Sequence, residues 1–402
     1  MGRYERIIQL GWRMDILKNA TFMVVGAGAL GNEVLKNLAL LGVGNILVID
    51  MDKIEDHNLT RSILFRGEDI GAYKSETAAR RVKEIDPSVN IHAFTGTIQD
   101  TFGLGVYRAV DVVFGCLDNI QARIDVNRNC LQTGALYIDG GLRGIDGDVK
   151  IFGPPFDVCF DCIVTPQLRD EAWKRYSCLK LKTRDNQEPT GPTSPTISSI
   201  IAGLQVQMGI KYIHNAQIPL NTRNSIFGNI DDFSQSQLSR HNQCPTHALY
   251  DMIPQDKIIS LPYASSHLNL RGLLEIIKKD LGQDAVLELD YDLITRVQCK
   301  HHSISRDIFK RRGTLYVDEM ECPECKKEGK TTNDAIMGEN FTNSIDGSED
   351  FLDKNIAEIG TPLLHIFKAK VFQEKGSIYK YYEISGDKEI ILKNSTQKQS
   401  VS

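Results

Sequence analysis

The sequence predicts a doubly wound, mostly parallel α/β sheet followed by a smaller α+β module with a zinc knuckle. Apolar runs at 21–25 and 45–49 flank a stretch with helical periodicity, which is the order of a β–α–β unit. The same alternation continues to residue 141, and repeated strand–helix–strand order favours a parallel sheet. Beyond residue 255 the pattern changes to a helix, a strand and closely spaced Cys and His residues, so a second module is expected there.

The first expected helix carries Leu30, Val34, Leu38 and Leu41 at three- and four-residue spacing, so one apolar stripe can pack on the sheet. The elements expected after the second strand are a helix at 74–85, strands at 89–96 and 110–116, a helix at 119–134 and a strand at 136–141. In such a sheet, ligands bind where the carboxyl ends of the strands meet.

A long segment then lacks any regular pattern. Residues 165–195 show neither strand nor sustained helix periodicity, and we expect a mobile crossover loop there. A helix follows at 196–213, for which Thr196 or Ser198 can serve as the N-cap.

The chain is therefore divided into a large domain at 1–254 and a C-terminal accessory module at 255–402. The pattern of the module predicts a helix at 270–282, a strand at 285–295, a polar linker at 326–350, a hairpin at 361–385 and a frayed tail at 391–402.

Composition excludes several classes of protein. Lys and Arg total 47 against 52 for Asp and Glu, a net charge of −5, which gives no general attraction to nucleic acid or to an anionic membrane. The sequence has no apolar run long enough to span a membrane, and its charged start does not resemble a signal peptide. We therefore expect a cytoplasmic protein without a nucleic-acid or membrane partner.

A glycine motif stands between the first strand and the first helix. Gly26, Gly28 and Gly31 form GxGxxG, a pattern that lets backbone N–H groups at a helix N-terminus approach a phosphate. A tight turn with close helix packing would produce the same pattern. Taken alone, the motif favours a dinucleotide oxidoreductase, with Asp50 as the acid that binds the ribose.

Charged residues after the next strands favour ATP over a dinucleotide. Asn58, Arg61 and Lys74 are expected at the carboxyl edge of the sheet, as is Asp118 after the strand at 110–116. Arg and Lys neutralise phosphate oxygens, and a carboxylate can hold the accompanying Mg²⁺. A nicotinamide enzyme would leave this set unexplained.

Several separated strings together resemble the ThiF/MoeB/HesA family, which includes the adenylating halves of ubiquitin-activating enzymes. They are RYERIIQL, GAGALGNEVLKNLALLGVGNILVIDMDKIEDHNLTRSILF, GAYKSETAA and CLDN. The resemblance covers roughly residues 1–250 and implies a Rossmann-like adenylation domain.

The resemblance implies roles for individual residues. Asp50 would hold the ribose, with Asp52 also at the nucleotide, and Asn58, Arg61 and Lys74 would bind the phosphates. Asp118 would bind magnesium and assist adenylate formation. Arg6 would reach across a homodimer into the partner's site. The family usually has Gln after the equivalent of Arg61, whereas this chain has Ser62, so one polar contact is expected to be weaker.

The implied activity is ATP-dependent adenylation of the C-terminal glycine of a ubiquitin-like protein. The alternative is adenylation of a sulfur-carrier protein of the thiamine or molybdopterin type. A catalytically silent scaffold is a third interpretation, against which the complete set of charged site residues argues. The C-terminal module could recruit a partner such as a conjugating enzyme.

Cys178 is the candidate for a thioester that follows adenylation. It lies within WKRYSCLKLK, where nearby cations lower a thiol pKa and enrich the thiolate. Family members that bind their substrate covalently place a cysteine in this loop. The alternative is that the adenylate passes directly to the sulfur of another protein. Cys116 and Cys130 are interpreted as buried structural residues.

Cysteine spacing predicts metal sites. Nine cysteines include two CxxC pairs, Cys159/Cys162 and Cys322/Cys325, which favour metal ligation over disulfides. Cys244 and His247 have the same spacing and could complete a structural zinc site with Cys159 and Cys162, a pairing that the resemblance supports.

A second set would combine Cys299, with His301 or His302, and the pair Cys322/Cys325. A competing assignment joins the two CxxC pairs to each other. The cofactors expected for the whole chain are therefore ATP, Mg²⁺ and Zn²⁺.

Overall fold

The computed structural model describes residues 2–169, 192–312, 314–374, 376–388 and 391. They form two compact units, one built from residues 2–166 and 192–252 and the other mainly from the described residues after 252. Among the described residues, no helix is long and apolar enough to cross a membrane.

The first unit is an eight-stranded sheet in the order β3-β2-β1-β4-β5-β6-β7-β8. The first five strands along the chain are parallel and the last three are antiparallel. They are β1 (Thr21–Val25), β2 (Asn45–Ile49), β3 (Asn90–Phe94), β4 (Val112–Gly115), β5 (Leu136–Arg143), β6 (Asp146–Phe152), β7 (Thr222–Phe227) and β8 (Asp232–Gln237). The predicted mostly parallel α/β fold is confirmed.

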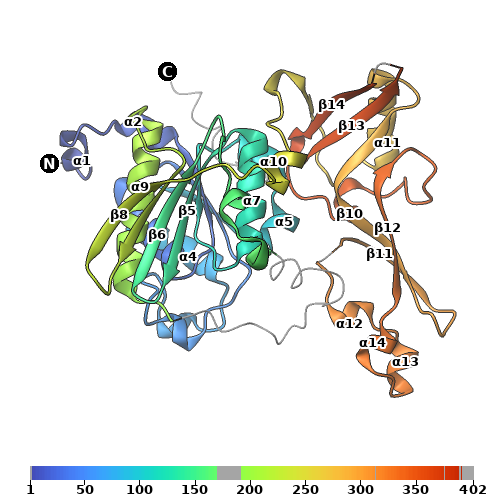
Figure 1. The fold of residues 1–402 in the computed structure, drawn as a ribbon, viewed down its shortest axis with the longest axis horizontal. Coiled ribbons are helices and arrows are strands. Elements are labelled where there is room, and N and C mark those ends of the chain that lie inside the picture. The colour runs from blue at the N-terminus through green and yellow to red at the C-terminus, as the bar shows by residue number, and fades with distance from the viewer. Residues whose placement is uncertain (1, 170–191, 313, 375, 389–390, 392–402) are drawn as a thin grey trace. The chain divides into compact units, whose positions relative to one another are not determined.

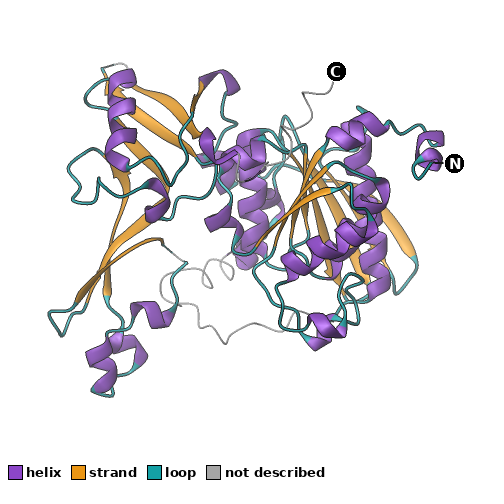
Figure 2. Ribbon diagram, turned by 180° about the vertical axis from the view of Figure 1, so that it is seen from behind, coloured by secondary structure: helices purple, strands orange, loops and turns teal. Residues whose placement is uncertain are grey.

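Helices cover both faces of this sheet (Figures 1 and 2). The larger ones are α3 (Ala29–Leu41), α4 (Lys74–Ile85), α7 (Ile120–Thr133) and α9 (Pro195–Ile213). The shorter helices of this unit are α1 (Glu5–Gln9), α2 (Met14–Asn19), α5 (Ile98–Thr101), α6 (Leu104–Arg108) and α10 (Pro245–Leu249), of which α1 buries none of its residues. The apolar stripe predicted for α3 packs into a core shared with α9 and the sheet.

Strand order places a switch point at the carboxyl ends of β1 and β4. From β1 the chain moves outward through β2 and β3, and it then returns to the other side of β1 at β4. The connections on the two sides leave these neighbouring strand ends in opposite directions, and the crevice between them is where open α/β sheets bind ligands.

The start of α9 differs from the prediction. The N-cap is Ser194, whose hydroxyl accepts a hydrogen bond from the amide of Thr196 at 3.2 Å. Neither Thr196 nor Ser198 is the cap, because Pro195 starts the helix: its φ is preset for the first helical position and it has no amide to satisfy.

The second unit contains a six-stranded sheet with the path β11-β10-β13-β14-β9, and β12 pairs with β10. Its strands are β9 (Ile258–Leu261), β10 (Val286–Gln298), β11 (Ser305–Arg311), β12 (Gly338–Ile345), β13 (Ile366–Gln373) and β14 (Gly376–Ile384). The helix α11 (Leu270–Leu281) packs on this sheet through its apolar face. Three short helices, α12 (Val317–Met320), α13 (Pro323–Lys327) and α14 (Thr332–Ala335), lie between β11 and β12.

The prediction of a polar linker at 326–350 was wrong. That stretch contains the end of α13, α14 and all of β12, which pairs with β10 over most of its length. The side chains of β12 are mostly exposed or half-buried, so its sequence lacks the apolar alternation of a strand. Its place in the sheet depends on backbone hydrogen bonds, which composition does not reveal.

Candidate nucleotide site and metal clusters

Each of the three glycines of the motif has a different structural environment. Gly26 follows β1 with φ +98°, and a Cβ there would lie 2.4 Å from the carbonyl oxygen of Cys116. A Cβ on Gly31 would lie 1.9 Å from the carbonyl oxygen of Gly26. Gly28, the N-cap of α3, has no atom within 4 Å of its Cβ position. The outer glycines thus serve close packing, while the middle one leaves open space where a phosphate can approach backbone N–H groups.

Asp50 holds this glycine loop in place. Its Oδ2 accepts a hydrogen bond from the amide of Ala27 at 2.6 Å, and its Oδ1 accepts one from the amide of Asp52 at 2.8 Å. Burial raises the pKa of Asp50, and the charge of Lys74 opposes that rise. The carboxylate predicted to bind a ribose therefore also supports the loop, which brings β2 and β1 together at the carboxyl edge.

Lys74, the first residue of α4, lies beside the same strand end. Its Nζ is 2.8 Å from Oδ2 of Asp52, and its amide donates to the carbonyl oxygen of Asp52 at 2.9 Å. The Lys74 side chain is 13% exposed against 40% for Asp52. The ammonium group is thus held near Asp50, which supports the glycine loop. There it can exchange the carboxylate oxygen of Asp52 for a phosphate oxygen.

Asn58 and Arg61 come from the short turn after β2. Asn58 is buried, and its Oδ1 accepts a hydrogen bond from the amide of Glu55 at 2.9 Å. The Arg61 amide donates to the carbonyl oxygen of Asn58 at 3.1 Å. Within the described residues, no carboxylate forms an ion pair with the Arg61 guanidinium, whose Nη1 contacts only the carbonyl oxygen of His57 at 3.4 Å.

Asn32, a residue that was not among the predicted site residues, connects the glycine loop to this turn. Its Nδ2 donates to the carbonyl oxygens of Ala27 at 2.7 Å and Gly28 at 3.0 Å. Its Oδ1 accepts a hydrogen bond from the amide of Leu64 at 2.8 Å, and the residue is fully buried. A polar residue immediately after the glycine motif, in the first turn of the helix, was the signal that could have identified it.

The departure at Ser62 occurs in the same turn. Ser62 is buried, and its Oγ has no hydrogen-bond partner within the described residues. Where the family usually has the longer side chain of Gln, this chain has a buried serine hydroxyl with no partner among the described residues.

Asp118 lies on the exposed turn after β4. The preceding carbonyl, that of Leu117, accepts a hydrogen bond from Nη2 of Arg123, and Asn119 caps α7. Nη1 of Arg123 in turn lies 2.8 Å from Oδ2 of the fully buried Asp139. This ion pair, which no sequence motif indicates, holds the turn that carries Asp118 at the carboxyl end of β4. Cys116, two residues before Asp118, lies against Gly26 of the glycine loop.

Arg6 lies far from this site. Its helix α1 follows Tyr4, whose ring packs against Gly42, the C-cap of α3, and whose hydroxyl donates to Asp86, the C-cap of α4. The glycine loop is at the opposite end of the 13-residue α3, roughly 20 Å away. Arg6 therefore does not reach the site of its own chain. Cys178 lies outside the described residues.

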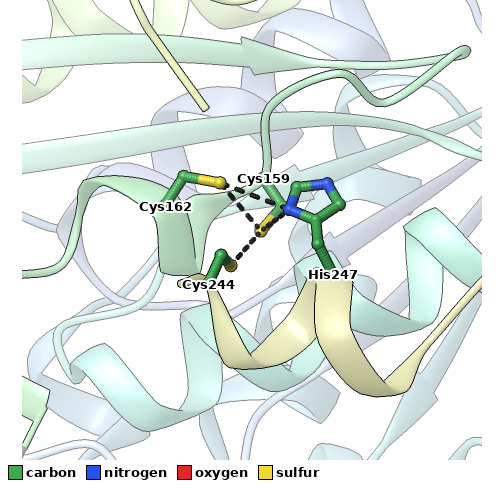
Figure 3. Close-up of side chains that lie close together, drawn as sticks. All are labelled: Cys159, Cys162, Cys244 and His247. Carbon is green, nitrogen blue, oxygen red and sulfur yellow. Dashed lines mark hydrogen bonds between the residues drawn. The ribbon is translucent and has the colours of Figure 1, made fainter. Parts of the chain in front are cut away.

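The first predicted metal cluster is assembled by the structure (Figure 3). The Cys159 Sγ atom is 3.7 Å from that of Cys162 and 3.5 Å from that of Cys244. Nδ1 of His247 lies 3.3 Å from Cys162 Sγ and 3.6 Å from Cys159 Sγ. Nε2 of His247 lies 3.0 Å from the carbonyl oxygen of Phe156, so a proton on Nε2 leaves Nδ1 free to bind a metal.

The chemistry of this donor set fits zinc. Three thiols and one imidazole form a closed tetrahedral ligand set of the structural type. Cys159, Cys162 and Cys244 bind zinc as thiolates, so formation of the site would release protons. The competing pairing of Cys159/Cys162 with Cys322/Cys325 is not the one that the structure assembles.

Of the other cysteines, Cys130 is fully buried and Cys116 is partly exposed beside the glycine loop. Burial raises the pKa of both thiols. Neither is suited to act as a nucleophile.

The chain is similar to proteins of a known family. A family model described as the ThiF family matches residues 6–246. The chain belongs to the ThiF family. It is 40% identical over 163 residues to SUMO-activating enzyme subunit 2 of Dictyostelium discoideum, which covers 40% of this chain and 25% of that protein. It is 40% identical over 153 residues to the Nedd8-activating enzyme E1 catalytic subunit of Drosophila melanogaster, covering 35% and 34%.

A longer match, 27% identical over 306 residues, joins this ThiF-family chain to ubiquitin-like modifier-activating enzyme 5 of Caenorhabditis elegans and covers 71% of this chain and 66% of that protein. The chain thus spans from a quarter to just under two thirds of the length of these relatives. Among solved structures, E. coli MccB with MccA-N7isoASN shares the fold at a TM-score of 0.50 and 24% identity, covering 61% of this chain and 75% of that one.

Proposed function

We propose that this ThiF-family chain adenylates the C-terminal glycine carboxylate of a ubiquitin-like protein, with ATP as the second substrate. The observation that carries the proposal is the open space at Gly28, at the switch point, together with Lys74 at the start of α4 and Arg61 and Asp118 on the turns after β2 and β4. Relatives named as activating enzymes for SUMO, Nedd8 and ubiquitin-like modifiers support the substrate class.

The reaction needs charge stabilisation more than proton transfer. A carboxylate oxygen of the glycine forms a bond to the α-phosphorus, the bond from that phosphorus to the bridging oxygen breaks, and pyrophosphate leaves. Lys74 and Arg61 stabilise the negative charge that develops on the phosphate oxygens. The attacking carboxylate is already ionised at neutral pH, so no general base is required.

Asp118 is assigned to magnesium. Its carboxylate is exposed on a turn that Arg123 and Asn119 fix, and hard oxygen ligands are those that Mg²⁺ prefers. Magnesium, when bound, would neutralise phosphate charge. The role of Asp118 is to hold the magnesium ion beside the N-terminus of α3.

Arg6 is assigned to the partner's site in a homodimer. It is exposed on α1, at the end of α3 that lies away from the glycine loop of its own chain. A cation in that position can serve a nucleotide only on another copy. Two copies related by a two-fold axis would exchange Arg6 reciprocally.

Cys178 is assigned to a thioester that forms after adenylation, with AMP as the leaving group. Zinc is assigned to the cluster of Cys159, Cys162, Cys244 and His247 as a structural ion. If the adenylate instead passes to the sulfur of another protein, as in sulfur-carrier activation, no thiol-sensitive adduct would form on this chain.

Pyrophosphate exchange into ATP, driven by ubiquitin-fold proteins from the same genome, tests the proposal. Lys74→Ala and Asp118→Ala should each lower the exchange rate by about 100-fold or more, because removal of one charge-stabilising group costs several kcal/mol. Lys380→Ala is the matched control, since Lys380 pairs with Asp280 within the second unit. Exchange that both site variants leave undiminished would overturn the assignment.

A further inference from the structure

We propose a second structural zinc site, formed by Cys299, His302, Cys322 and Cys325, that holds together the part of the second unit around α12, α13 and α14. The inference goes beyond the proposed adenylation, because these residues belong to neither the nucleotide site nor the region matched by the family model.

The four ligand atoms lie at the distances of a tetrahedral zinc shell. Zinc bonds of about 2.3 Å to sulfur and about 2.0 Å to nitrogen place sulfur atoms about 3.8 Å apart and sulfur about 3.5 Å from nitrogen. In the structure, the Sγ atoms of Cys299 and Cys325 are 3.6 Å apart. Nδ1 of His302 lies 3.6 Å from Cys299, 3.4 Å from Cys325 and 3.8 Å from Cys322. Three thiols thus surround one ring nitrogen, an arrangement that a disulfide does not explain.

The histidine in this cluster is His302 and not His301. His301 contributes only its backbone amide, which donates to the Cys299 sulfur at 3.3 Å, while its ring is not part of the cluster. Of the two histidines predicted as alternatives, His301 is therefore not a ligand in this cluster. Spacing alone cannot tell which of two adjacent histidines is the ligand, because the orientation of each ring depends on how the chain turns after β10.

Groups outside the cluster orient its members. Nε2 of His302 lies 3.1 Å from a carboxylate oxygen of Glu328. A carboxylate that holds the distal ring nitrogen keeps the proton there and leaves Nδ1 free for a metal. Nζ of Lys330 lies 3.7 Å from the Cys325 sulfur, so one amide and one cation lie against the thiols of the cluster.

Burial shows what the metal would stabilise. Cys322 and Cys325 are fully buried and Cys299 is 7% exposed, in a small apolar core that also includes Val297, Met320 and neighbouring residues. That core is separate from the larger core under α11. The helices α12 and α14 have 4 residues each and α13 has 5, lengths that are not stable on their own.

Coordination to one metal ion would link the end of β10 to α13. Cys299 comes directly after β10, whereas Cys322 and Cys325 belong to the N-cap and the first turn of α13. Four protein ligands leave no open coordination position, so the site is structural, and binding free energy becomes folding free energy.

Metal analysis of the purified full chain tests the site. Wild-type protein should contain about two zinc ions per chain, and Cys325→Ser should contain one fewer. Cys162→Ser, in the first cluster, should also lose one, and the double variant should lose both. Wild-type protein with a single zinc, unchanged by Cys325→Ser, would overturn the proposal, as would iron in place of zinc.

The adjacent histidines supply a matched pair. His302→Ala should lose the second zinc on dialysis against a mild chelator, whereas His301→Ala should retain it. Equal retention by the two variants would contradict the assignment of His302. If Cys325→Ser is insoluble, this pair and the wild-type zinc content still decide the question.

Hydrogen exchange separates this site from the proposed activity. In Cys325→Ser, amides at 299–337 should exchange at least tenfold faster, while amides of the first sheet remain protected. Pyrophosphate exchange should stay within twofold of wild type. Unchanged protection at 299–337 would refute the structural role of the metal, whatever the outcome of the adenylation assay.

Discussion

Replacing Asn32 with alanine tests how the nucleotide loop is held. Asn32 makes hydrogen bonds of 2.7 and 3.0 Å to the carbonyls of Ala27 and Gly28, and it accepts one of 2.8 Å from the amide of Leu64. Each bond contributes about 1 kcal/mol, and a buried amide left without a partner costs about 1–3 kcal/mol. The higher helix propensity of alanine returns about 0.6 kcal/mol. We therefore expect Asn32→Ala to lower the local opening free energy by about 2–3 kcal/mol.

Hydrogen exchange at the Leu64 amide measures this directly. A loss of 2–3 kcal/mol corresponds to about 30- to 150-fold faster exchange, and the affinity for ATP should fall as well, because the loop that faces the phosphates is no longer fixed. Asn32→Asp keeps the acceptor for Leu64 but places oxygen against two carbonyl oxygens, so it should be at least as damaging.

Asn45→Ala is the control. Asn45 lies at the other end of the sheet, and its bonds to Ala20 and Asn90, at 3.3 and 3.2 Å, are longer and only partly buried. Exchange at Leu64 and affinity for ATP should be unchanged in this variant. Wild-type exchange and wild-type affinity in Asn32→Ala would refute the reasoning.

Three further predictions concern groups around the site. Cys178→Ser should spare pyrophosphate exchange but abolish a thiol-sensitive adduct with the ubiquitin-like substrate on gels, and a persistent adduct would implicate another cysteine. Mixing Arg6→Ala with Asp118→Ala protomers should restore about a quarter of wild-type activity through hybrid dimers, and no recovery on mixing would remove Arg6 from the partner's site. Burial would raise the pKa of Asp86, but hydrogen bonds from Tyr4 and Ser88 lower it below its usual range. Docking of α1 should therefore be stable above the ordinary carboxyl pKa and weaken as pH falls through the lowered value. Asp86→Asn should remove this pH dependence, which hydrogen exchange at residues 2–10 would report.

The parallel half of the first sheet could be predicted because its signals are local. The apolar run of β1, the glycines after it and the stripe of α3 all lie within about one helix length along the chain. The misplaced cap of α9 shows the limit of such signals, since the decisive residue was Pro195, which selects Ser194 through its own fixed φ. The strand β12 was missed because its pairing with β10 involves backbone groups that every sequence has.

Residue type and spacing were thus enough to indicate a glycine loop, a set of cations beside it and two groups of metal-ligating side chains. Only the folded chain decided that Asn32 bridges the loop to Leu64, that Arg123 and Asp139 hold the turn before Asp118, and that the ring in the second cluster belongs to His302. The physical reason is that a periodic pattern reports which face of an element is buried. Which polar groups meet depends instead on the crossing of segments far apart in the chain, and that is settled by packing.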